Sequence, residues 1–317
     1  MAARPAHILV VLDADAKHQP ALDRGVWLAE RTGAALELLV CDYDQDLSAS
    51  GPFDSTALSS ARRRVLAGHR HALEARIRHV AARGIRVRID VRWEHPLEAA
   101  VLSKIAETGA DLVLKSTRYH SALGRTLFSA ADWNLMTRCP VDLWLVKPRP
   151  IAQNPTILTA IDPRPYLGGP GSIDERILDA GLALERAVQG ELHVFHGFDI
   201  SAALAVSADA LSAPISAPAR DLKSTLMREH RAAVLALTDP RGLAHERVHV
   251  HEGPVRQLLV AWTRDMNVDV LVIAAVSRGR RDVPCIGSTA ERVLDEIPCD
   301  LLIVAPPGAA AATIRAV

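Results

Sequence analysis

The chain has 317 residues, of which 49% are apolar and 23% charged, which is typical of soluble proteins and long enough for two domains. Its 37 basic residues balance its 37 acidic residues, so the net charge favours neither nucleic acid nor an anionic membrane as a partner. No apolar run is long enough to cross a bilayer. The N-terminus enters a strand-like segment directly, unlike a signal peptide, and the four scattered cysteines favour a reducing cytoplasm.

The first half of the chain alternates strand-like and helix-like segments. Short apolar or alternating segments predict strands at residues 7–13, 36–41, 85–91, 111–116 and 141–146. Segments with helical spacing predict helices at 20–32, 58–83, 95–108 and 127–137, the second of them long and basic. This alternation predicts the α/β class, a parallel sheet with helices on both faces.

A proline-bearing linker, KPRPIAQNP at residues 147–155, separates this unit from a second copy of it. The second copy has predicted strands at 156–162, 191–197, 247–251, 269–274 and 299–305, and predicted helices at 172–188, 221–237, 255–266 and 288–297. Matching stretches support a duplication, among them DLVL at 111–114 and DVLV at 269–272. We therefore predict two tandem α/β domains, at residues 1–149 and 154–308.

The segment after the fourth strand of the second copy has the features of an anion site. Its loop is small and basic, with Ser277, Arg278, Gly279, Arg280 and Arg281, and it ends at Gly287 and Ser288, where a helix is predicted to begin. The free N–H groups and the dipole of a helix N-terminus favour a phosphate. The three arginines also fit a simpler interpretation, since charges in an exposed loop are commonly just solvated.

These residues resemble the phosphate loop of the universal stress protein family, whose nucleotide-binding members carry G-x-x-G, nine residues, then G-[S/T]. Gly287-Ser288 matches the end of that motif, while Ala274 and Ser277 replace its first two glycines. Residues 111–147 are similar to the first domain of the E-type tandem members of the family. The matching positions are Lys115, Phe128, Asp132-Trp133 and Arg138-Cys139-Pro140.

The resemblance implies two Rossmann-like, adenine nucleotide alpha hydrolase-like domains, each with a five-stranded, mostly parallel sheet. It also implies that the domains pair through their last strands, at 141–146 and 299–304, as an internal pseudo-dimer.

By the same resemblance, the second domain would bind ATP. The implied ligand contacts are Asp162, Val194, Gly253, Ala274, Ser277, Gly279, Gly287 and Ser288. Asp162 is explained equally well as a turn residue before Pro163, and Ser288 caps a helix with or without a ligand. Because the first two glycines are replaced, another small anionic ligand remains an alternative to ATP.

The first domain lacks the phosphate-loop glycines, and Ser129-Ala130 stands where Gly-Ser would be. Four basic residues would still let its loop hold an anion: Lys115, Arg118, His120 and Arg125.

The sequence thus predicts a cytoplasmic stress-response protein that binds a small ligand and acts through protein partners. No catalytic motif is present, so any enzymatic activity would be weak ATP hydrolysis. A carrier of a hydrophobic or anionic metabolite is the other alternative, supported by the apolar loop at 200–219. His249 and His251 alternate on one strand but have no evident third ligand, so no metal site is predicted.

Overall fold

The first half of the chain forms twelve elements in the computed structural model, which describes residues 5–48, 55–120, 125–163, 172–200, 217–274 and 294–306. In chain order they are β1 (His7–Leu12), α1 (Pro20–Thr32), β2 (Ala35–Asp42), α2 (Gln45–Ser48), α3 (Ser55–Ala82), β3 (Val87–Trp93), α4 (Leu97–Thr108), β4 (Leu112–Ser116), β5 (Arg118–His120), β6 (Arg125–Leu127), α5 (Ala130–Arg138) and β7 (Asp142–Val146). The second half follows with β8 (Thr156–Ala160), α6 (Ile173–Val188), β9 (Glu191–Phe198), α8 (Ala217–Thr238), η1 (Asp239–Arg241), η2 (His245–Arg247), β10 (Val248–Glu252), α9 (Val255–Asp265), β11 (Val270–Ala274) and β12 (Asp300–Val304).

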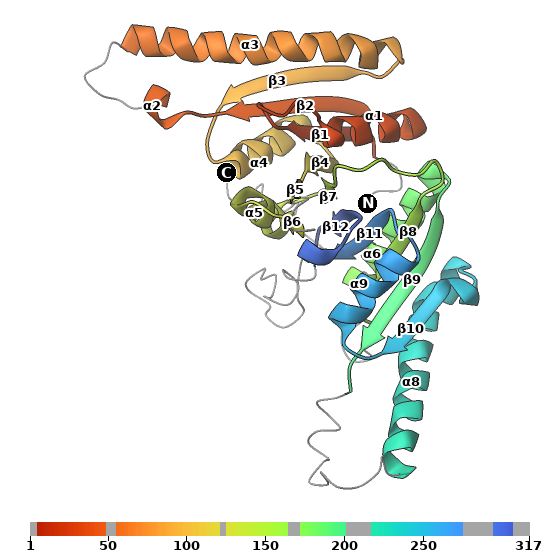
Figure 1. Ribbon diagram of the computed structural model, residues 1–317. Helices are drawn as coiled ribbons and strands as arrows, with labels where there is room; N and C mark the ends of the chain where they lie inside the picture. Colours follow the sequence, from red (N-terminus) through yellow and green to blue (C-terminus); the bar gives the residue numbers. More distant parts are fainter. Residues whose placement is uncertain are drawn as a thin grey trace.

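Ten of the strands form one continuous sheet in the order β10-β9-β8-β11-β12-β7-β4-β1-β2-β3 (Figure 1). Neighbouring strands are parallel within each half. The halves meet where β12 pairs antiparallel with β7, with Leu302 opposite Trp144. Two like units related by a two-fold axis present the same edge to each other, which makes their joining strands antiparallel. The predicted tandem α/β fold and the predicted pairing of the last strands are confirmed.

The sheet separates two hydrophobic cores, and each core continues across both domains. One packs α1, α3, α6 and α8 against one face, through residues such as Leu28, Leu73 and Val234. The other packs α4, α5, α9 and residues 294–297 against the opposite face. Central strands are therefore covered on both sides, which is why β7 (DLWLV) and β12 (DLLIV) are buried at every position.

Each copy places a glycine where its first helix crosses its first strand. A Cβ atom on Gly25 of α1 would lie 2.9 Å from the Val10 side chain, and one on Gly181 of α6 would lie 2.3 Å from that of Thr159. The helices approach the sheet this closely because no side chain separates them. The duplication is thus visible in the packing as well as in the element order.

Buried carboxylates fasten the two domains at the β7–β12 junction. Asp300 accepts hydrogen bonds from Arg24 Nε at 2.8 Å, from Trp144 Nε1 at 2.9 Å and from the Lys147 N–H at 2.9 Å. In the related position, Asp142 accepts from the Ala305 N–H at 3.0 Å. Each last strand therefore begins with an aspartate that holds the backbone just beyond the end of the other.

Some predicted boundaries in the first domain are wrong: α3 begins at Ser55 and not at 58, β3 spans Val87–Trp93 and not 85–91, and α5 begins later than expected. The helix expected at 127–137 begins at Ala130, because Leu127 pairs with Arg118 in the β5–β6 hairpin. Ser129 and Asp132 then form a reciprocal capping box, in which Ser129 Oγ accepts from the Asp132 N–H and Asp132 Oδ2 accepts from the Ser129 N–H. The predicted helix at 288–297 lies mostly outside the described residues, which include only its end.

Candidate ligand site at the carboxyl edge of the second domain

The topology of the second domain marks one place for a ligand. From β8 the chain moves outward to β9 and β10, and then crosses back to place β11 on the other side of β8. In open α/β sheets, ligands bind at the carboxyl ends of the strands where the order reverses in this way. Here that place lies between the ends of β8 and β11.

Three of the predicted site residues reach this edge. Asp162 follows β8 by two residues, its side chain is 43% exposed, and its N–H donates to Asp174 Oδ1 at 3.0 Å. Ala274 is the last residue of β11. Gly253 follows β10 with a φ of 143°, a conformation that side-chain-bearing residues rarely adopt, and its N–H donates to the Phe198 carbonyl at 2.9 Å.

Val194 does not reach the edge. It lies in the middle of β9, fully buried, opposite Thr159 of β8 and Val248 of β10. Because β9 continues to Phe198, the backbone that leaves this strand at the edge begins at Asp199. The remaining predicted contacts, Ser277, Gly279, Gly287 and Ser288, lie outside the described residues, as do Arg278, Arg280 and Arg281.

A pair of histidines that sequence reasoning missed stands beside Asp162. His196 is fully buried, with Nδ1 3.0 Å from the Ile161 carbonyl and Nε2 2.8 Å from His230 Nδ1. A carbonyl only accepts, so His196 Nδ1 carries a proton and donates it to the Ile161 carbonyl. Phe198 stacks on His230 with ring centroids 3.9 Å apart. No sequence signal linked His230 on α8 to His196 on β9.

A second histidine cluster occupies the opposite face of β9 and β10. His193 Nδ1 lies 3.1 Å from His249 Nε2, and Trp262 of α9 covers His249 and His251 with centroids 4.4 and 4.8 Å away. Burial, reinforced by His193 and His251, lowers the pKa of His249 to about 4. Among the residues that the structure describes, no group of three or more histidine, cysteine, aspartate or glutamate side chains is arranged to hold a metal ion.

In the first domain the segment after β1 is held by Gln19, while Asp13, the counterpart of Asp162, is exposed. Gln19 is buried after β1, where its Nε2 donates to the Asp13 carbonyl at 2.6 Å and to the Ala16 carbonyl at 3.1 Å. Lys115, which the sequence suggested as an anion ligand, donates to the buried Asp132 at 2.6 Å. Its charge is thus neutralised within the fold. The side chains of Arg118, His120 and Arg125 lie outside the description.

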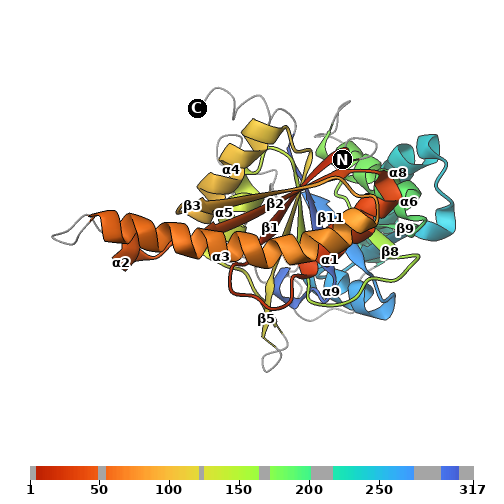
Figure 2. The ribbon, with the colours of Figure 1, turned by 90° about the horizontal axis from the view of Figure 1, so that it is seen from above.

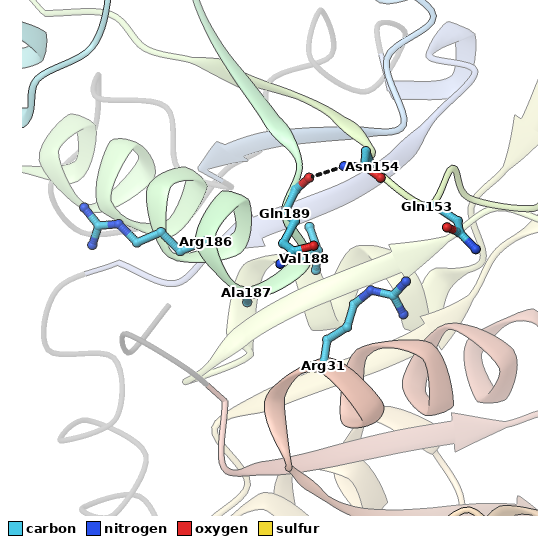
Figure 3. Close-up of a pocket in the computed structure, with 7 residues that line it drawn as sticks. All are labelled: Arg31, Gln153, Asn154, Arg186, Ala187, Val188 and Gln189. Atoms are coloured by element: carbon cyan, nitrogen blue, oxygen red, sulfur yellow. Dashed lines mark hydrogen bonds between the residues drawn. The ribbon is translucent and has the colours of Figure 1, made fainter.

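A pocket of about 440 Å³ lies away from this edge, at the carboxyl ends of α1 and α6 (Figure 3). Its lining residues are Arg31, Gln153, Asn154, Arg186, Ala187, Val188 and Gln189. Asn154 Nδ2 donates to the Gln189 carbonyl at 3.0 Å, and Arg31 donates to the Trp27 carbonyl at 3.1 Å. Arg186 points away from Arg31 in Figure 3. The carbonyl end of a helix disfavours anions, so this pocket does not match the predicted ligand.

None of the described helices is long and apolar enough to cross a membrane.

Comparison with known proteins gives a consistent result over the whole fold. The model of the universal stress protein family matches residues 6–147 and 155–305. Universal stress protein E of Escherichia coli strain K12 is 24% identical over 307 residues, which covers 95% of this chain and 94% of the relative. The universal stress protein E homolog of Haemophilus influenzae is also 24% identical, over 95% of this chain and 97% of its own.

Solved structures agree with these matches. A functionally unknown protein from Pseudomonas aeruginosa PAO1 superposes with a TM-score of 0.74 at 22% identity, covering 99% of this chain and 97% of that one. A universal stress protein from Archaeoglobus fulgidus gives 0.60 at 14% identity, over 93% and 97%. The tandem α/β domains, the antiparallel junction and the two family matches lead to one conclusion: the chain belongs to the universal stress protein family, as a tandem-domain member similar to universal stress protein E.

Proposed function

We propose that the protein is a cytoplasmic stress-response regulator whose second domain binds one small anionic ligand, with ATP as the first candidate. The observation that carries this proposal is the place of Asp162, which follows β8 where the strand order of the second domain reverses. The Asp162 side chain is 43% exposed, and its Oδ1 lies 4.0 Å from Nδ1 of His196 on the neighbouring strand β9.

The geometry supports a role for three residues toward such a ligand. The Asp162 carboxylate would accept hydrogen bonds from ligand hydroxyl or amino groups, as carboxylates do in charge-assisted pairs. Gly253 and Ala274 present little or no side chain, so their backbone is open to close approach. The phosphate-binding contribution is proposed for Ser277, Gly279, Gly287 and Ser288, with the three loop arginines as an additional source of positive charge.

Isothermal titration of ligand-stripped protein with ATP, with and without Mg²⁺, tests the proposal. We expect micromolar binding at one site per chain. Asp162→Ala should weaken binding by about tenfold or more, since a hydrogen bond to a charged group contributes about 1.5–3 kcal/mol. Asp13→Ala, the matched change in the first domain, should leave the affinity within about twofold. Absence of heat at millimolar ATP, or equal losses in the two variants, would contradict an ATP site in the second domain.

A further inference from the structure

The neutral total charge of this protein hides a strong local asymmetry. Residues 55–93, which contain α3 and β3, carry ten arginines but only Glu74 and Asp90 as acids, so the rest of the chain is net acidic. Helix α3 itself has six arginines, no lysine and one glutamate. Its counterpart after the second strand of the other copy, α8, has three arginines, one lysine and two acids. The excess of basic residues is therefore a property of α3 in the first domain and is not shared by α8, its counterpart in the second.

Helix α3 lies at one end of the molecule, over β3, the last strand of the sheet (Figures 1 and 2). One side of it faces the core through Leu73 and Val80, which are buried, and Ile77, which packs against them. On the other side Arg63, Arg64, Arg70 and Arg78 are exposed. In the described structure none of these four forms an ion pair, and only Arg63 has a side-chain hydrogen bond, to Ser60.

The exposed arginines follow the axis of the helix. Arg64, His71 and Arg78 are seven residues apart, which places them along one line at intervals of about 10 Å. Arg63 and Arg70 form a second line beside it, since they too are seven residues apart. We call this set, Arg63, Arg64, Arg70, His71 and Arg78, the α3 basic face. Its four arginines present permanent positive charges along a helix about 42 Å long.

We propose that the α3 basic face binds the phosphate backbone of nucleic acid without reading its sequence. Arginine presents a planar fork of donors that matches phosphate oxygens, and α3 contains six arginines and no lysine. A protein partner would require buried aromatic or aliphatic anchors at the centre of its interface. Between its arginines the α3 basic face exposes only alanine, glycine, histidine and glutamate side chains.

A membrane surface fits the same face less well. Helices that lie in the bilayer interface insert an apolar face below the headgroups. The apolar side of α3 is already packed against the sheet through Leu73, Ile77 and Val80, so it is not available for insertion. Charge would be the sole attraction to lipid, whereas a polyanionic duplex also releases condensed counterions when arginines bind it.

Fluorescence anisotropy with a labelled duplex DNA of about 24 base pairs tests the inference, with titrations from about 50 to 200 mM salt. If each of the four arginines contacts one phosphate, a plot of log K against log[salt] has a slope of about −3.6, since each contact contributes about −0.9. The variant R64Q/R70Q/R78Q changes only exposed side chains without hydrogen bonds or ion pairs in the structure, and should reduce that slope by about 2.7. Circular dichroism would establish that its helix content is unchanged.

The matched control is R228Q/R231Q, which removes two exposed arginines from α8, the equivalent helix of the second domain. It should leave both affinity and salt slope unchanged. The inference is overturned if the wild-type protein does not bind the duplex at about 50 mM salt, or if the control loses as much affinity as the α3 variant. It is also overturned if phosphatidylserine vesicles bind through these arginines and the duplex does not. Asp162→Ala should leave duplex binding intact, so this result is independent of the proposed ligand site.

Discussion

The junction between the domains should depend on the charge of one buried residue, Asp300. Asp300→Asn keeps the size of the side chain but replaces one acceptor oxygen by a donor NH₂ group. The two carboxylate oxygens now accept from Arg24, Trp144 and the Lys147 N–H, so at least one of these donors would face another donor. Arg24, whose side chain is 4% exposed, would keep its charge without a carboxylate partner.

The expected loss is about 3–5 kcal/mol, the range for removing one partner of a buried ion pair. This is a large part of the total free energy of unfolding, which is about 5–15 kcal/mol for ordinary proteins. Urea unfolding followed by circular dichroism measures it. As a matched control, Asp179→Asn breaks the exposed pair that Asp179 forms with Arg241 at 2.7 Å, and it should cost no more than about 1 kcal/mol.

A double-mutant cycle separates the ion pair from other effects of the substitution. Arg24→Met should also cost about 3–5 kcal/mol, because it leaves the Asp300 carboxylate buried without its cation. The double variant R24M/D300N should cost less than the sum of the two, by about 0.5–3 kcal/mol, since contacting residues couple. The reasoning is refuted if Asp300→Asn costs no more than Asp179→Asn, or if the two single losses simply add.

Two further predictions concern the second domain. The pKa of His249 is lowered to about 4 from its usual 6.5, so its contribution to stability is present above about pH 6.5 and is lost as the pH falls toward 4. Urea midpoints from about pH 7 to 4.5 should therefore fall less for His249→Phe, which cannot bind a proton, than for the wild type, and parallel curves would contradict this. Gly253→Ala should destabilise by about 1–3 kcal/mol, because its φ of 143° is strained for alanine. Gly68→Ala in α3, where a Cβ atom meets nothing within 4 Å, should instead stabilise the protein by about 0.4–1 kcal/mol. Thermal melts of the two variants and the wild type measure both changes. If both changes had the same sign, the backbone argument would fail.

The sequence by itself determined the element order, the duplication and the fold class. Buried strands such as DLWLV and DLLIV are recognisable because a strand covered on both faces needs apolar residues at successive positions. Helix ends were partly recognisable for a similarly local reason, as at Gly33, which closes α1 with a φ of 76°. The resemblance to a family added the pairing of the two last strands, which local patterns do not encode.

Only the tertiary structure decided which polar groups meet. Arg24 and Asp300 are 276 residues apart, and His196 and His230 are 34 apart on different elements. Lys115 appeared available for an anion until Asp132, on the helix that follows, was found beside it. The capping box that begins this helix fixes Asp132 in place, although the sequence predicted an earlier start.

The physical reason is that sequence patterns arise from residues close together in the chain, whereas polar contacts join residues that are far apart in it. Hydrophobic periodicity and turn chemistry act between neighbours in the chain, so they can be recognised residue by residue. Hydrogen bonds and ion pairs form between whichever groups the crossovers bring within about 3 Å. That depends on the packing of the whole sheet, and it decided that Arg24 meets Asp300 and that Lys115 meets Asp132.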